Sequence, residues 1–518
     1  MYSQPYQRER SAHRLQGRLP QPVHIAAEPS KGGISSQSPV RVVALTVLFA
    51  AAAIYEAIHL SAVLAPGVWI HLRTGLWILH NRSFPHTGLF SQSSNLPWND
   101  SSWGFQVILG AAYHIFGLRA LPILLVVFKV ALAVATFLLA RAGRARFWGA
   151  ILLSALAQFL ISGLQPMPSA PSILFLALEL VLLVRSRQSG SVRELFWLPL
   201  LFLLWANLDI EFVFGLLVLA LFVLAVGFEQ ASRSLGATWV SDRIQPLDLP
   251  KAGGAALLSL LATFANPYTV HPLAGAFRTL YSHAAFEHFS EMKAMTFRQP
   301  QDFLLMLLVM TAFLSLGRRR SLDLFGLLTL LAGTLIAFRA QREGWLAVLP
   351  AIGWISHGLN LKQEQQSDRK WVALPAVALA GIIAVALVPD SNTLMNKVRQ
   401  RFPVKACDYI QANHLPAPLY NAYIWGSFLT WYLPEYPVAV DSRVELYGDD
   451  FLSKYFEVAG GKERLETDPV FSRSSTLLLE KGSAMAKALT NLPVLSAQYR
   501  LVYSDDLASV FVRRAASP

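Results

Sequence analysis

The stretch at residues 119–140 reads RALPILLVVFKVALAVATFLLA. A helix needs about 20 residues to cross the hydrocarbon core of a bilayer, and backbone groups in lipid must be hydrogen-bonded within their own segment. Similar apolar runs recur along the chain, which is 54% hydrophobic and only 15% charged. Soluble domains carry about 25% charged residues. The pattern therefore predicts an α-helical polytopic membrane protein.

The apolar runs predict about eleven membrane-spanning helices. They lie near residues 42–65, 119–140, 147–164, 170–185, 195–208, 211–228, 251–265, 302–317, 321–338, 343–360 and 371–388. A further apolar run, 103–116, is only 14 residues long and is predicted not to cross. With this run outside the bilayer core, every Lys and Arg cluster between the helices falls on one side, as the cytoplasmic bias of basic residues requires.

This topology divides the chain into three parts. We expect a disordered basic cytoplasmic tail at 1–41, a transmembrane domain at 42–388 and a small extracytoplasmic α/β domain at 389–518. The first outer loop of the transmembrane domain is residues 66–118. In the last part, 403–414 has a helical pattern, and short alternating runs such as Ser475–Leu479 and Tyr499–Tyr503 indicate strands.

The charge and cysteine content exclude several classes of protein. The net charge of +12 comes from short basic clusters between apolar runs, which is how membrane topology is encoded, so nucleic acid is not an expected partner. A single cysteine, Cys407, excludes a disulfide framework and a cysteine metal site. The sequence identifies no metal site and no cofactor, although a divalent metal remains an option.

Most polar candidates fall in the predicted outer segments. In the first outer loop, residues 68–80 suit a helix in the interface. There are two interpretations of this loop. Its aromatic residues either anchor it at the membrane interface, or it forms a lid over a site in which His71, Arg73 and Asp100 face a polar substrate. In the turn at 205–211, Asp209 and Glu211 either cap the next helix or line a cavity.

Two further sets of charges have two interpretations each. Arg339 and Arg342 lie in an outer turn, against the positive-inside trend. They either reach to lipid headgroups or bind a phosphate through the guanidinium fork. Glu56, Lys129 and Glu179 lie inside predicted spans, where charges are functional candidates or structural pairs. For Lys129 we expect a structural pair with Glu179.

The order of the polar motifs resembles the bacterial GT-C class of membrane glycosyltransferases, in an uncharacterised branch related to dolichyl-phosphate-mannose protein mannosyltransferases. The motifs are WxHLxxG at 69–75, PHTxxFS at 85–91, the Trp98 and Trp103 pair, WANL at 205–208, NPY at 266–268, the Arg339 and Arg342 turn, NxYxWG at 421–426 and DxRxExYG at 441–448. The resemblance implies a GT-C-like fold in the bacterial inner (plasma) membrane. It also implies a polyprenyl-phosphate sugar lipid as partner, an acceptor that the sequence does not name, and a site at the outer membrane face.

The resemblance also implies an acid in the first outer loop as the catalytic residue. Relatives usually carry acids before WxHL and after PHT, where this chain has Ala65-Pro66-Gly67 and Gly88. Asp100 is therefore the first candidate for the base that removes the acceptor proton, with Asp209, Glu211 and Glu56 as reserves. Arg339, Arg342, His71 and Arg73 are the candidates for the donor phosphate.

Two other classes remain open. A catalytically degenerate relative would bind a lipid-linked glycan or a partner protein without transferring a sugar, and the missing first-loop acids favour this alternative. A transporter is the second alternative, although the chain shows no internal repeat of the kind common in transporters.

Overall fold

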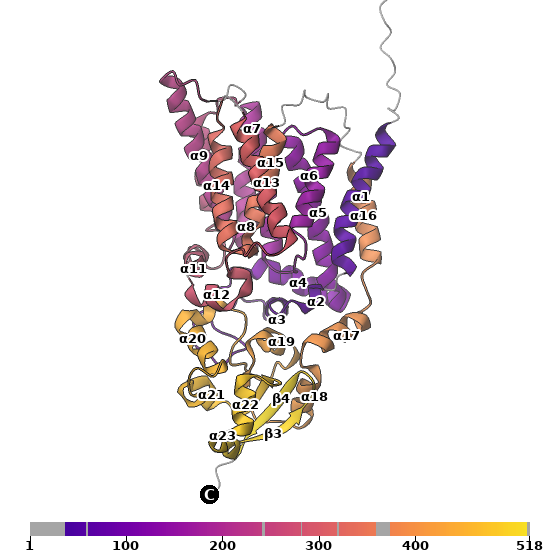
Figure 1. Ribbon diagram of the computed structural model, residues 1–518, viewed down its shortest axis with the longest axis vertical. Helices are drawn as coiled ribbons and strands as arrows, with labels where there is room; N and C mark the ends of the chain where they lie inside the picture. Colours follow the sequence, from indigo (N-terminus) through magenta and orange to yellow (C-terminus); the bar gives the residue numbers. More distant parts are fainter. Residues whose placement is uncertain are drawn as a thin grey trace, which may run out of the picture.

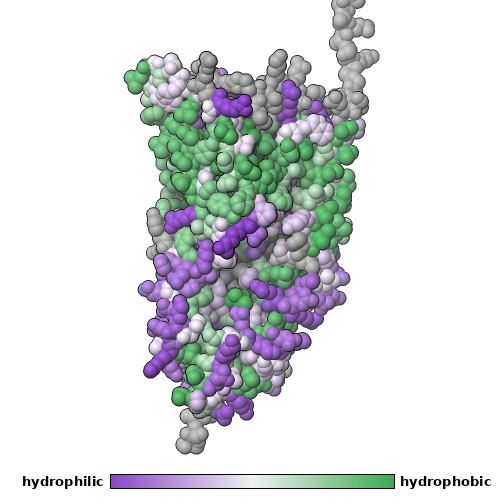
Figure 2. All heavy atoms as spheres, in the orientation of Figure 1, coloured by the Kyte–Doolittle hydropathy of each residue, from purple (hydrophilic) through white to green (hydrophobic). Residues whose placement is uncertain are grey.

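The computed structural model describes residues 37–58, 61–240, 244–280, 282–318, 321–358 and 373–514. Most of the predicted disordered tail, 1–36, lies outside these residues. The described chain forms a helical bundle with an α/β domain beneath it (Figure 1). On the face that Figure 2 shows, the surface of the bundle is largely hydrophobic and that of the lower part is more hydrophilic.

The bundle and its connecting loops contain sixteen described α-helices. They are α1 (Gln37–Ile58), α2 (Ser61–Leu64), α3 (Val68–Asn81), α4 (Trp103–Phe116), α5 (Ala120–Ala142), α6 (Phe147–Leu160), α7 (Ser169–Ser189), α8 (Leu198–Leu208), α9 (Phe212–Ser234), α10 (Leu249–Ala262), α11 (His271–Leu280), α12 (His283–His288), α13 (Pro300–Gly317), α14 (Leu324–Arg339), α15 (Trp345–Gly358) and α16 (Ala373–Ala386). Most of the long ones coincide with apolar runs predicted to span the membrane.

The count of eleven spans is not confirmed. Among the described residues, five helical stretches are long and apolar enough to cross: Pro39–Ile58, Trp103–Ala142, Ser169–Ser189, Phe212–Ser234 and Pro300–Gly317. A sixth is a pair bent by 65°, formed by α16 and the following α17 (Ser391–Arg401). Other predicted spans correspond to shorter apolar helices, such as α6, α10 and α14.

Helix α4 corresponds to the apolar run at 103–116, which is predicted not to cross the membrane. It is separated from α5 by a single 3₁₀ turn, Gly117–Arg119, in which Gly117 has a φ of +57°. Instead of continuing α5, α4 packs on α3 at the end of the bundle nearest the α/β domain (Figure 1). The two backbones touch at Gly75, where an added Cβ would lie 1.9 Å from the carbonyl oxygen of Gln106.

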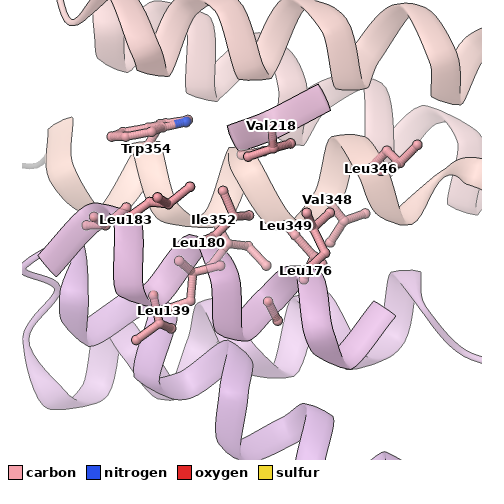
Figure 3. Close-up of a cluster of buried hydrophobic side chains, with 14 of the residues drawn as sticks. Leu139, Leu176, Leu180, Leu183, Val218, Leu346, Val348, Leu349, Ile352 and Trp354 are labelled. Carbon is pink, nitrogen blue, oxygen red and sulfur yellow. The ribbon is translucent and has the colours of Figure 1, made fainter. Parts of the chain in front are cut away.

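The bundle core is made by large aliphatic side chains from helices α5, α7, α9 and α15. Figure 3 shows Leu139, Leu176, Leu180 and Ile352 meeting in this core, with Trp354 beside them.

A buried ion cluster lies at the end of the bundle away from the α/β domain. The guanidinium of Arg187 on α7 lies 2.9 Å from a carboxylate oxygen of Glu229 on α9 and 2.9 Å from one of Asp323, the residue before α14. Asp323 caps α14 by accepting from the backbone N–H of Gly326, and Glu229 accepts from that of Leu324. The cluster therefore ties three helices together.

The α/β domain is built on a four-stranded sheet of order β1-β2-β4-β3. Strand β1 (Leu419–Asn421) is parallel to β2 (Thr476–Glu480), and β4 (Ala508–Arg513) is antiparallel to both β2 and β3 (Tyr499–Ser504). Its helices are α18 (Val404–Ala412), α19 (Tyr423–Tyr432), α20 (Val444–Ala459), α21 (Pro469–Arg473), α22 (Ala484–Asn491) and α23 (Pro493–Gln498). The predicted helix at 403–414 and the strands near 475 and 499 are confirmed.

The first outer loop is part of the α/β domain's structure. Ser91 forms a parallel bridge with Val438, and Val438 exchanges backbone hydrogen bonds with Phe90 and Gln92. Helix α3 is enclosed as well: Trp69 is fully buried and its ring lies against those of Phe428 and Trp431. Trp69 therefore does not belong to a membrane-interface belt, because the α/β domain covers it.

Candidate active site

A cavity of about 590 Å³ lies between the helix bundle and the α/β domain. This volume is typical of small-molecule sites. The walls come from the segments that sequence analysis placed on the outer side: the start of α3, the loop before α4, the 205–211 turn, the segment after α12, the turn after α14, and the α/β domain. Residues that contribute to the walls include Gly67, His71, Ser102, Ser169, Asp209, Glu211, His288, Glu291, Arg342, Tyr423, Arg443, Glu445 and Glu480.

Four predicted site residues line this cavity: His71, Asp209, Glu211 and Arg342. Arg342 donates from Nη2 to Glu211 Oε1 at 2.6 Å and from Nε to Glu343 Oε1 at 3.1 Å. Burial lowers the pKa of Arg342, but the negative charges of Glu343, Glu211 and Asp209 outweigh burial and raise this pKa above its ordinary value. The Arg342 side chain remains 42% exposed, so this guanidinium faces the cavity as well as its carboxylates.

Asp209 is held by short hydrogen bonds and lines the cavity. Its Oδ2 accepts from the hydroxyl of Ser172 at 2.6 Å, and that hydroxyl accepts from the indole N–H of Trp205 at 2.7 Å. Burial raises the pKa of Asp209 to about 6, against the lowering effects of Ser172 and Arg342. A carboxylate with a pKa near 6 is ionised at neutral pH and still basic enough to accept a proton.

Glu211 is the second carboxylate of the turn. Burial, followed by the charges of Glu343 and Asp209, raises its pKa well above the ordinary value, while Arg342 lowers it. Its Oε2 has no hydrogen-bond partner among the described residues and is buried. The turn at 205–211 therefore presents a carboxylate pair to the cavity, as one of its two interpretations predicted.

Asp100 lies directly behind the cavity wall formed by Ser101 and Ser102. Its Oδ1 accepts from the backbone N–H of Ser102 at 3.1 Å and from Nε2 of Gln106 at 2.9 Å. Its Oδ2 is buried and has no partner among the described residues. Burial raises the pKa of Asp100 to about 7. Asp100 is thus a base of suitable strength that lies one layer away from the cavity.

Gln106 connects Asp100 to His71. Its Nε2 lies 3.2 Å from His71 Nδ1, so the amide group can donate one hydrogen to each neighbour. Burial, followed by the nearby charge of Arg443, lowers the pKa of His71 to about 4. His71 is therefore neutral at physiological pH, with its ring proton on Nε2. It can donate a hydrogen bond in the cavity but brings no positive charge to a phosphate.

The remaining predicted site residues lie elsewhere. Arg73 stacks over the ring of Phe90, and Arg339 is exposed with its guanidinium 4.9 Å from the ring centre of Phe286. Neither lines the cavity.

Glu56 on α1 forms an ion pair with Lys129 on α5 at 3.3 Å and accepts from the backbone N–H of Gly163. The expected pairing of Lys129 with Glu179 is therefore wrong. Both carboxylate oxygens of Glu179 lack a hydrogen-bond partner among the described residues. Lys129 instead also donates to the carbonyls of Gln158 and Ile161, near the end of α6.

Two residues of the DxRxExYG motif reach the cavity without having been predicted as site residues. Arg443 donates to both oxygens of Asp441, at 2.9 and 2.6 Å, and stacks over Trp98. Glu445 accepts from the indole N–H of Trp98 at 3.2 Å. The signal that could have found them is the motif itself, which is dense in charged residues within the α/β domain.

The two glycines at the departures from the family pattern differ in their surroundings. A Cβ at Gly88 would lie 2.4 Å from the backbone oxygen of Ser93, so the loop leaves no room for a side chain. Gly67 has an ordinary helical backbone, and its Cβ would meet only the flexible end of Met167 at 2.7 Å. Because Gly67 lines the cavity, an acid at this position would point towards it.

Solved structures share this fold. The archaeal oligosaccharyltransferase AglB from Archaeoglobus fulgidus, in complex with an inhibitory peptide and a dolichol-phosphate, has a TM-score of 0.52 at 13% identity, covering 90% of this chain and 73% of its own. ArnT from Cupriavidus metallidurans, bound to undecaprenyl phosphate, has a TM-score of 0.50 at 12% identity, covering 93% of this chain and 99% of its own.

No protein-family model matches the chain, and a comparison with curated proteins finds no significant match. At the identities above, the structural likeness shows the fold alone. It confirms the predicted GT-C-like fold: a multi-pass helical membrane protein with a small C-terminal sheet.

Proposed function

We propose that this protein is a membrane glycosyltransferase that moves a sugar from a polyprenyl-phosphate donor to an acceptor hydroxyl at the outer face of the bacterial inner membrane. The observation that carries the proposal is the cavity in which Asp209 and Arg342 meet at the end of the helix bundle. The fold supports it, since both similar structures hold a polyprenyl-type phosphate.

In the proposed reaction, the acceptor oxygen attacks the anomeric carbon while its proton passes to a carboxylate. The bond between that carbon and the phosphate oxygen breaks, and the phosphate leaves with the electron pair. A phosphate is a weak base, so the step requires a base and a cation rather than a general acid.

The geometry favours Asp209 over Asp100 as this base. Asp209 lines the cavity directly, whereas Asp100 is buried and only its neighbours Ser101 and Ser102 line it. Asp100 acts as a positioning residue, because its Oδ1 fixes Ser102 and Gln106, and Gln106 in turn orients His71. Arg342 is the cation for the leaving phosphate: its Nη1 makes no hydrogen bond to a described residue, and its side chain is partly exposed.

The test is a transfer assay on the purified full chain with a panel of polyprenyl-phosphate sugars. Asp209→Asn should reduce turnover by about 10²–10⁴-fold, the usual contribution of a general base. Asp100→Asn should reduce it less, with a shift in the pH profile. If Asp209→Asn keeps turnover within a few-fold of the original protein while Asp100→Asn abolishes it, Asp100 is the base.

A catalytically degenerate protein remains the second candidate, because the structure leaves no space for an acid at Gly88. Gly67→Asp distinguishes the two. If the original protein transfers no sugar from the whole panel and Gly67→Asp gains transfer, the chain is a degenerate relative that lacks this acid. If the original protein is active, the acid at position 67 is dispensable.

A further inference from the structure

The cavity is lined by more acidic than basic side chains, although the chain as a whole carries a net charge of +12. Five carboxylates line it against two guanidinium groups, a formal excess of three negative charges. The acids are Asp209, Glu211, Glu291, Glu445 and Glu480. A cleft lined mainly by one sign of charge concentrates ligands of the opposite sign.

Both guanidinium groups in the cavity are paired with carboxylates, and in each of them only Nη1 makes no hydrogen bond to a described residue. Arg443 is bound by both oxygens of Asp441, and Arg342 by Glu211 and Glu343. One oxygen of Glu211, Oε2, is left without a partner among the described residues, on a side chain only 5% exposed. A buried acceptor with no donor is costly, so this position is suited to a donor group brought by a ligand.

An aromatic wall lies in the same cavity, where the end of α12 and the residue after it pack against α19 and α20 of the α/β domain. It consists of Phe289, Tyr423, Phe456 and His288, with Phe289 and Tyr423 5.2 Å apart, Tyr423 and Phe456 5.2 Å apart, and His288 and Phe456 4.3 Å apart between ring centres. Aromatic ring faces attract organic cations, and groups of such rings are used to recognise ammonium ligands.

Exposed carboxylates flank this aromatic wall. Glu291 follows Phe289 by two residues, and Glu480 ends strand β2; both side chains are exposed, line the cavity and have no ion pair among the described residues. The segment of Glu291 also reaches the Arg342 turn, since the backbone N–H of Gln341 donates to the carbonyl of Lys293 at 3.0 Å. The acids, the rings and Glu211 therefore line the same cavity.

We propose that the α/β domain half of this cavity is a subsite for a ligand that carries a primary ammonium group, and that this ligand is the acceptor. The ammonium lies against the aromatic wall with Glu291 and Glu480 as counter-charges. The assignment to the acceptor rests on the proposed transferase function; the recognition of the ammonium group does not, because it follows from the charges and rings alone.

Direct binding tests the inference without any transfer reaction. The purified full chain is titrated with glucosamine and, as the matched neutral probe, with N-acetylglucosamine, which lacks the positive charge. We expect glucosamine to bind at least about tenfold more tightly, with an affinity that falls as salt rises. Equal affinity for the two probes, or tighter binding of N-acetylglucosamine, would overturn the inference.

Variants locate the site. Glu291→Gln combined with Glu480→Gln should weaken glucosamine binding by about three- to tenfold, as expected for two partly exposed charges, and should leave N-acetylglucosamine unaffected. Glu435→Gln, an exposed acid of the same domain outside the cavity, is the matched control and should change neither. If the double variant binds glucosamine as the original protein does, the subsite is wrongly placed.

The same titration separates this inference from the proposed function. Ammonium-selective binding without any sugar transfer would contradict the transferase and leave the subsite standing. Transfer to acceptors that carry no amine, together with equal binding of the two probes, would contradict the subsite and leave the transferase standing.

Discussion

Two arginines at opposite ends of the helix bundle each pair with carboxylates, but the two clusters differ in their exposure. We call the cluster of Arg187, Glu229 and Asp323 the sealed cluster, and the cluster of Arg342, Glu211 and Glu343 the open cluster. Arg187 is sealed, with 4% of its side chain exposed, and its carboxylates also satisfy the first N–H groups of α14. Arg342 is 42% exposed and lies among three carboxylates, of which one oxygen has no described partner. The comparison shows how the same residue types fix helices at one end, where the arginine is buried, and remain accessible to a ligand at the other, where it is partly exposed.

The largest effect is expected at the sealed cluster. Arg187→Met removes the guanidinium that Glu229 and Asp323 share in a buried position, which should cost about 3–5 kcal/mol of stability. Thermal unfolding in detergent, followed by size-exclusion chromatography, measures the loss. The control is Arg500→Met, at an exposed position on β3. Equal unfolding temperatures for the two variants would show that the sealed cluster does not hold the helices.

At the open cluster, the effect should appear in transfer rather than in stability. Arg342→Met removes the cation assigned to the leaving phosphate and should lower turnover by about 10²–10³-fold. Arg342→Lys keeps the charge but loses the planar fork, so its turnover should lie between those of Arg342→Met and the original protein. If both variants transfer sugar normally, the phosphate is bound elsewhere.

The pH dependence of sugar transfer tests which carboxylate, Asp209 or Asp100, acts as the base in the cavity. Because burial raises the pKa of Asp209 to about 6, the base is protonated and inactive below that pH and ionised above it. The rate should therefore fall about tenfold per pH unit below pH 6 and level off above it. A pH–rate profile on the original protein, with stability checked at each pH, measures this. A midpoint near 7 would indicate Asp100 instead, whose pKa is about 7.

The smallest expected effect is at the helix crossing that supports the open end. Gly75→Ala would place a Cβ 1.9 Å from the carbonyl of Gln106, forcing α3 away from α4 at a cost of about 1–3 kcal/mol. Gly253→Ala on α10 meets nothing within 4 Å and should be neutral or stabilising. Unfolding temperatures of the pair measure the difference, and no difference would mean that the crossing relaxes freely.

Much of the bundle could be predicted because lipid imposes a simple pattern on the sequence. The run at 119–140 corresponds to α5 (Ala120–Ala142) and the run at 211–228 to α9 (Phe212–Ser234). The α/β domain was harder to predict. The alternating residues at 419–426 are typical of a strand, but only Leu419–Asn421 form one. A helix begins at Tyr423, and Gly426 lets this helix, α19, pack directly on the backbone of Val440.

The candidate site was predicted in part. The Asp209 and Glu211 turn could be found because acids at membrane depth stand out in an apolar sequence. Which arginine of the pair enters the cavity could not, because a 3₁₀ turn at Gln341–Glu343 directs Arg342 inward while Arg339 ends α14 outside. Glu291 and Glu480 became site candidates only when segments almost 190 residues apart were brought together.

The bridge between Ser91 and Val438 has a practical consequence for exchanging parts between relatives. Because this loop completes the surface of the C-terminal domain, a chimera that replaces residues 389–514 alone would pair a foreign domain with a native loop. The Asp100 segment would lose its support even though no transmembrane helix had been altered. A working chimera has to exchange residues 82–102 together with the C-terminal domain. The structural unit to be exchanged therefore consists of two segments that are far apart in the sequence.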